Sequence, residues 1–272
     1  MNRPWRQQWE LISSLAKRDL KTRYKESVLG FFWSLLRPAF LTLILWLVFS
    51  LIVPIRFDQG RVPYWMHVLV SVLAWNFLVG SLFDAAGSIL ANANLLKKVK
   101  LDAEVFPVSS ALANAVHFAL ALALVLVIVA VVGPGLGVNL LLLPAALALE
   151  VLLILGLGFF LSALNVFYRD VGSALELGVM AWFYITPIIY PLQEARRSLG
   201  RFGDIWFHLY MLNPMAPIVG LVRRAVLYGP NAELSDRALF AYAGVSAVVS
   251  LCLFASGWML FRRMSGRFAD EL

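Results

Sequence analysis

Few residues of this chain have the type and spacing that catalysis requires. The three histidines, His67, His117 and His208, lie far apart, and neither they nor Cys252 have the spacing of metal ligands. The sequence also lacks a phosphate loop of the form Gly-x-x-x-x-Gly-Lys-Ser/Thr, so it has no such means of holding a nucleotide. We therefore expect the histidines to be packed and hydrogen-bonded, and we expect no catalytic or metal site.

Three carboxylates lie in or beside apolar runs, where ionisable groups are costly and mark either a pathway or a structural pair. Asp84 and Glu176 are expected near the cytoplasmic boundary, where water reaches them. Glu150 lies deeper in its run. We expect it to pair with a basic or hydroxyl group, and a proton relay is the alternative.

Aromatic residues accompany two of the apolar runs and could stack on the apolar faces of sugar rings. Trp and Tyr also anchor membrane interfaces and pack between helices, and composition alone favours these roles. The aromatic residues in question are Phe31, Phe32 and Trp33 beside the first run, and Trp182, Phe183, Tyr184 and Tyr190 in the fifth.

The elements that carry these residues are those of an integral membrane protein. The chain is 61% hydrophobic and 14% charged, against about 25% charged in average soluble domains. Runs such as 40–53, 116–132 and 140–164 approach or exceed the roughly 20 residues that cross a bilayer. No connection is long enough to form a soluble domain, so we expect one membrane domain over residues 1–272.

The net charge of +7 comes from basic residues at the ends of the apolar runs, which argues for membrane topology rather than for nucleic-acid binding. With the N-terminus inside, fifteen of the 23 Lys and Arg residues lie on the cytoplasmic side. This excess predicts an even number of spans, with both termini in the cytoplasm.

Hydropathy predicts an all-α fold with six transmembrane helices. An amphipathic helix in residues 1–27 is expected to lie on the membrane surface, although packing on a partner would give the same pattern. Residues 192–237 are too apolar for a solvated loop and too interrupted to cross, which predicts two short re-entrant helices. The expected spans are 31–53 or 38–53, 65–90, 105–132, 140–167, 175–190 and 239–261.

Several motifs resemble those of one family, the ATP-binding-cassette permeases that export bacterial cell-surface polysaccharides such as O-antigen, capsule and teichoic acid. They occur in the family's order and cover nearly the whole chain. The motifs are RDLKTRYKESVLGFFWSLLRP at 18–38, NLLKKVK at 94–100, Phe106-Pro107, NVFYRD at 165–170, TPIIY at 186–190 and NPMAP at 213–217.

This resemblance implies a homodimer in the bacterial inner membrane, bound to two copies of a separate ATPase subunit. ATP and magnesium would then bind the partner, and this chain would hold no cofactor and be no enzyme. The implied cargo is a lipid-linked polysaccharide, most directly O-antigen.

The resemblance also implies roles for particular residues. Spans one and five would wall a channel between the two copies. The expected channel residues are Phe31, Trp33, Trp182, Tyr184 and Tyr190. Basic residues Arg18, Arg23 and Lys25 would attract the lipid diphosphate, with positive-inside topology as the equal alternative. The residues expected to dock on the ATPase are Asn94, Lys97, Lys98, Tyr168, Arg169 and Asp170.

Other functions remain open at this point. An exporter of drugs or small lipids would share the architecture but have a narrower path. A proton-coupled secondary carrier would work without an ATPase and require Glu150. A membrane glycosyltransferase or flippase accessory would need clustered carboxylates, whereas the acidic residues here are scattered.

Overall fold

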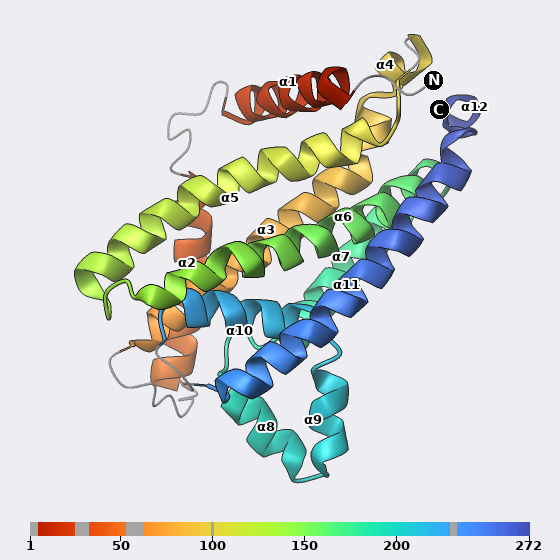
Figure 1. Ribbon diagram of the computed structural model, residues 1–272. Helices are drawn as coiled ribbons and strands as arrows, with labels where there is room; N and C mark the ends of the chain where they lie inside the picture. Colours follow the sequence, from red (N-terminus) through yellow and green to blue (C-terminus); the bar gives the residue numbers. More distant parts are fainter. Residues whose placement is uncertain (1–4, 25–32, 53–61, 99–100, 229–232) are drawn as a thin grey trace.

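The computed structural model describes residues 5–24, 33–52, 62–98, 101–228 and 233–272, and these residues form helices joined by short connections (Figure 1). The helices are α1 (Trp5–Tyr24), α2 (Trp33–Leu47), α3 (Tyr64–Ala91), α4 (Ala93–Lys98), α5 (Val105–Val132), α6 (Leu143–Phe167), α7 (Val171–Ile185), α8 (Leu192–Gly200), α9 (Asp204–Tyr210), α10 (Met215–Val226), α11 (Asp236–Ser265) and α12 (Phe268–Glu271).

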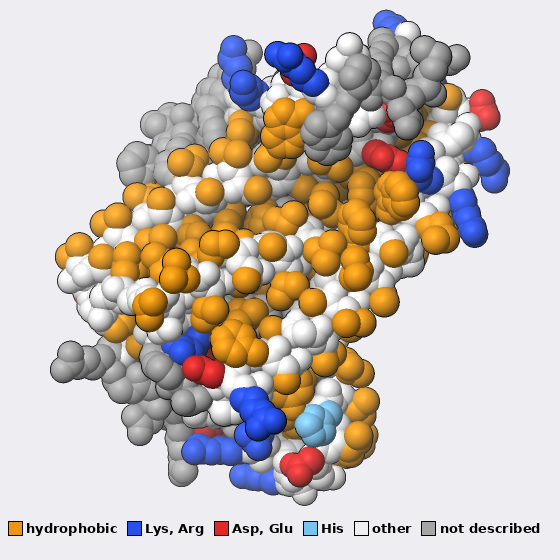
Figure 2. Space-filling model, viewed as in Figure 1, with side chains coloured by type: hydrophobic (Ala, Val, Ile, Leu, Met, Phe, Trp, Pro, Cys, Tyr) orange, Lys and Arg blue, Asp and Glu red, His pale blue; other side chains and the backbone are white. Residues whose placement is uncertain are grey.

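Four helices are long and apolar enough to cross a membrane. They are α3, α5, α11 and the stretch Val138–Phe167, in which a 3₁₀ turn precedes α6. These helices confirm four of the predicted spans to within a few residues. Figure 2 shows hydrophobic side chains across the middle of one face and charged side chains toward its two ends, as expected of a surface within a bilayer.

The remaining two predicted spans form shorter apolar helices. The stretch Leu36–Ile52 comprises most of α2 and a π-helical turn, and α7 covers Val171–Ile185. Thr186 and Pro187 follow the last turn of α7, because proline cannot continue a helix. Both α2 and α7 pack against α3. By length alone these two are not established as spans, so the count of six remains a prediction.

Residues 192–237 differ from the expectation of two short helices. They form α8, α9 and α10 and the start of α11, and the axes of α9 and α10 meet at an angle of 82°. The bend falls at Asn213-Pro214, where proline interrupts the backbone hydrogen-bond ladder. Every residue of α10 is buried, whereas α9 buries only Phe207.

The N-terminal helix α1 packs on the chain itself. Ile12 and Leu15 are buried in one apolar cluster with Phe106 of α5, and Ala16 is buried too, whereas Trp9 stays exposed. The apolar face that was expected to lie on the membrane is therefore partly covered by α5. In Figure 1, α1, α4 and α12 gather at one end of the helix bundle, and α8 and α9 lie at the opposite end.

Two glycines let α6 and α11 touch backbone to backbone. A Cβ atom on Gly156 would lie 2.6 Å from the backbone nitrogen of Phe254, and one on Gly257 would collide with the Gly156 carbonyl. Small residues at such crossings are a common means of joining helices in membranes, where tight packing replaces the hydrophobic effect. This contact holds α11 against the rest of the bundle.

Candidate functional site

The end of α7 is fixed by hydrogen bonds to Asn213. The Trp182 indole N–H donates to Asn213 Oδ1 at 2.7 Å, and Asn213 Nδ2 donates to Thr186 Oγ1 at 3.1 Å. The Trp182 ring also meets Trp75 of α3 edge to face, with 5.6 Å between ring centroids. Trp182 is half-buried and packed between helices, so its ring is a structural contact as well as a candidate wall residue.

The other expected channel residues differ in exposure. Tyr184 is 65% exposed and Trp33 is 44% exposed. Tyr190 is partly buried, and its hydroxyl donates to the Tyr184 carbonyl at 3.1 Å and lies 3.4 Å from the Tyr210 hydroxyl. Phe31 lies outside the described residues. Trp33 on α2 and Tyr184 on α7 are therefore exposed, and both of these short helices pack against α3. Tyr190 instead stabilises the turn after α7.

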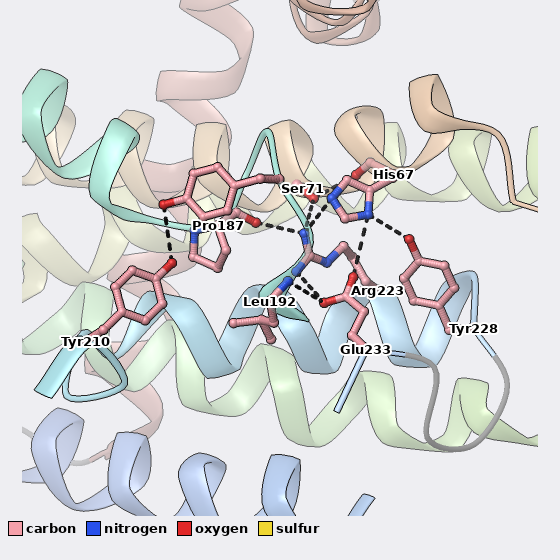
Figure 3. Close-up of polar contacts among 9 residues, drawn as sticks. His67, Ser71, Pro187, Leu192, Tyr210, Arg223, Tyr228 and Glu233 are labelled. Atoms are coloured by element: carbon pink, nitrogen blue, oxygen red, sulfur yellow. Dashed lines mark hydrogen bonds and ion pairs between the residues drawn. The ribbon is translucent and has the colours of Figure 1, made fainter. Parts of the chain in front are cut away.

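A buried polar network, absent from the sequence-based expectations, holds that turn (Figure 3). The Arg223 side chain is fully buried. One of its terminal nitrogens donates to the Pro187 carbonyl at 2.7 Å and lies 2.8 Å from His67 Nε2. The other donates to Glu233 Oε2 at 2.7 Å. Arg223 of α10 thus ties together α3, the α7–α8 turn and the segment before α11.

His67 and Glu233 complete the network. His67 Nδ1 lies 2.6 Å from the Tyr228 hydroxyl and 3.5 Å from Glu233 Oε1. Burial raises the pKa of the Glu233 carboxyl, and the adjacent Arg223 guanidinium opposes that rise. A buried ion pair of this kind persists only when its charges are matched and hydrogen-bonded. The packed and hydrogen-bonded role predicted for His67 is confirmed.

The neighbouring Arg224 makes a second ion pair in the same region. Its guanidinium donates to both carboxylate oxygens of Asp236, at 3.0 and 3.1 Å, and to the Tyr228 carbonyl at 2.8 Å. The topology count, which placed fifteen Lys and Arg residues in the cytoplasm, assigned Arg223 and Arg224 to the eight on the opposite side. The sequence does hold one indication of this role: two adjacent arginines lie in a helical segment that is otherwise apolar.

The residues proposed to attract a diphosphate are only partly described. Arg18 is about half-exposed, and its guanidinium donates to Asn92 Oδ1 at 2.8 Å and to Asp19 at 3.1 Å. This contact ties α1 to the C-terminal end of α3. The Arg23 side chain and Lys25 lie outside the described residues.

The two segments expected to dock on an ATPase lie at the same end of the bundle. Asn94, Lys97 and Lys98 are exposed on α4, and Tyr168, Arg169 and Asp170 are exposed in the turn between α6 and α7. The C-terminal helix α12 contacts both α4 and α6, and its Phe268 meets Phe167 with ring centroids 6.0 Å apart. Sequence reasoning assigned no role to α12, because its four residues carry no motif.

The carboxylates in the apolar runs have different surroundings. Asp84 is partly buried and accepts a hydrogen bond from Asn114 Nδ2 at 2.7 Å, and Glu176 is exposed on α7. Glu150 is fully buried, and neither carboxylate oxygen has a hydrogen-bond partner among the described residues. The expected partner of Glu150 is thus not found in that part of the chain. The described residues also contain no group of three His, Cys, Asp or Glu side chains able to hold a metal.

Comparison with known proteins identifies the family. The model of the ABC-2 type transporter family matches residues 10–227. This range includes α2 with Trp33, α7 with Tyr184, and the charged segments of α4 and Tyr168–Asp170. The chain belongs to the ABC-2 type transporter family. The resemblance inferred from the motifs is confirmed, and the membrane-spanning helices are those of an ABC transporter permease.

Curated members of this family match nearly the whole chain. One is the O-antigen export system permease protein RfbA of Myxococcus xanthus, 32% identical over 269 residues that cover 96% of this chain and 95% of the relative. Another, of the same name, is from Klebsiella pneumoniae, 25% identical over 265 residues that cover 97% and 95%. Membership of the ABC-2 type transporter family gives the chain a role in transport and argues against the glycosyltransferase and the secondary carrier.

Proposed function

We propose that this chain is the transmembrane subunit of an ATP-driven exporter that moves a lipid-linked cell-surface polysaccharide, most directly O-antigen, across the bacterial inner membrane. The observation that carries the proposal is the match, over nearly the entire chain, to permeases named for O-antigen export. Loss of such a subunit would interrupt lipopolysaccharide biosynthesis. Exposed aromatic side chains on α2 and α7 provide surfaces on which sugar rings can stack.

Two copies of the chain enclose the conduit, with α2 and α7 of each copy as its walls. These helices expose apolar and aromatic side chains, including Phe40, Met180 and Tyr184, which are at least 60% exposed in the single chain. A second copy would cover part of this surface. In this arrangement α2 and α7 are spans one and five, the bent α9–α10 pair is re-entrant, and the whole chain is one permease domain.

Energy comes from two copies of a separate ATPase subunit that carries ATP and magnesium. The absence of a phosphate loop from the sequence supports this division of labour. Exposed α4 and the Tyr168–Asp170 turn, on the same end of the bundle, are the docking surface. That end, with both termini, faces the cytoplasm because fifteen of the 23 Lys and Arg residues were assigned to it.

The lipid diphosphate of the cargo enters beside α1. Arg18, Arg23 and Lys25 supply positive charge there, and guanidinium and ammonium groups pair well with phosphate oxygens. Arg18 is already oriented by Asn92 and retains about half of its side chain exposed.

Deletion of the gene, followed by complementation, tests the proposed cargo. Surface polysaccharide should disappear on deletion and return with the wild-type chain, and drug sensitivity should be unchanged. Unchanged surface polysaccharide together with raised drug sensitivity would instead support an exporter of drugs or small lipids, which the same architecture could serve.

A further inference from the structure

An amide side chain is exposed near the middle of the most buried spanning helix. Asn76 lies near the centre of the 28-residue α3, whose most apolar window is 78% buried within the chain. Its side chain is nonetheless exposed among the described residues. Polar groups at this depth are costly in lipid and generally face a water-filled cavity or a protein partner.

The other directions around α3 are occupied. Phe77 stacks on Phe118 of α5 at a ring distance of 4.8 Å, and the Ala86 carbonyl accepts a hydrogen bond from Asn165 of α6 at 2.9 Å. Trp75 meets Trp182 of α7. In Figure 1, α3 runs between α2 and α7 on the far side of the bundle. These contacts lie on other sides of α3 than the one that carries Asn76, which is exposed on a helix that packs against both α2 and α7.

Asn76, Phe83, Gly87 and Leu90 recur at intervals of seven, four and three residues, so they lie along one side of α3. We call these four residues the α3 strip. Phe83 and Leu90 are exposed, and a Cβ atom added to Gly87 would meet nothing within 4 Å. The strip thus combines an amide that can donate and accept hydrogen bonds with an exposed aromatic ring and open space.

We infer that the α3 strip is the floor of the conduit and a contact site for the sugar residues of the glycan, with Asn76 hydrogen-bonding to sugar hydroxyls and Phe83 stacking on a ring face. This inference rests on the proposed function, and it adds a third helix to the walls formed by α2 and α7. Amide groups beside aromatic rings suit carbohydrates, which have hydroxyls at their rims and apolar C–H faces.

Cysteine labelling tests whether the strip faces water. The native chain has one cysteine, Cys252, which is exposed near the middle of α11, a helix with no place in the proposed path, and serves as the control. Asn76→Cys is made in a Cys252→Ala background, and a charged, membrane-impermeant methanethiosulfonate is applied to the permease–ATPase complex in lipid with ATP. The cysteine at position 76 should react at least tenfold faster than native Cys252. Equal, slow reaction at both positions would overturn the inference.

Two substitutions test sugar contact separately from water access. Asn76→Leu keeps a similar size but removes the hydrogen-bonding groups, and Asn76→Gln retains them. In a deletion strain, the Leu variant should export several-fold less surface glycan than the Gln variant at equal membrane levels. Export at the wild-type level by Asn76→Leu would refute the inferred sugar contact at the α3 strip, and it would not affect the proposed function. Surface glycan that does not depend on the chain at all would refute the proposed function, and the labelling rates would still report on the path.

Discussion

Arg223 is a fully buried cation whose charge is balanced by Glu233. Replacing Arg223 with Met would leave the Glu233 carboxyl buried without its partner, and such a loss typically costs about 3–5 kcal/mol. We therefore expect a marked fall in melting temperature in detergent. The exposed Arg201→Met is the matched control and should leave the melting temperature unchanged.

The double variant Arg223→Met with Glu233→Gln separates charge balance from simple packing. Removing both charges should recover part of the lost stability, because no unpaired charge then remains buried. If the double variant is as unstable as the sum of the two single variants, the ion pair does not account for the effect.

Arg169 is exposed in the turn between α6 and α7, where we place ATPase docking. Arg169→Glu should abolish export, because it reverses a charge in the docking surface, while membrane insertion stays normal. Surface glycan and membrane-fraction levels are the two measurements. Arg263→Glu, an exposed change on α11 toward the same end, is the control and should export normally. Normal surface glycan in Arg169→Glu would rule out a docking role.

Among the elements, the contact between α6 and α11 depends on the absence of side chains at Gly156 and Gly257. Gly257→Val would force the helices apart, since overpacking commonly costs about 1–3 kcal/mol and here meets rigid backbone. The variant should melt at a lower temperature. Gly244→Val lies on the same helix with nothing within 4 Å of its Cβ position, and should change the melting temperature little. An equal effect at both positions would contradict the close contact.

The long apolar helices could be predicted from the sequence, because about 20 apolar residues in a row have few alternatives to crossing a bilayer. The number of helices in 192–237 could not, since Asn213-Pro214 and the chain around Gly203 divide that segment in ways that hydropathy averages out. The amphipathic pattern of α1 predicted a helix but not what covers its apolar face.

Motifs in the sequence point to candidate site residues, whereas contacts between distant residues leave no pattern in it. The charged segments of α4 and Tyr168–Asp170 lie in family motifs, and the aromatic residues of α7 were singled out as aromatic side chains in an apolar run. The Arg223 network joins residues as far apart in sequence as His67 and Glu233, and the spacing of residues in the sequence does not reveal such contacts. Asn76 was missed for a related reason, because its exposure depends on which neighbours surround α3.

In the proposed assembly, this chain forms one half of a channel that is powered by another protein. Trp33 and Tyr184 lie on the helices that would meet the second copy, and the charged end would meet the ATPase. Neither the chain alone nor the ATPase alone should therefore move cargo.

Reconstitution into lipid vesicles tests this most directly, with the permease, its ATPase and a lipid-linked glycan present, and with protection of the glycan from an external glycosidase as the readout. We expect the glycan to become protected only when ATP and both subunits are present. Glycan transport by the permease alone, or ATP hydrolysis by the permease without its partner, would contradict this expectation.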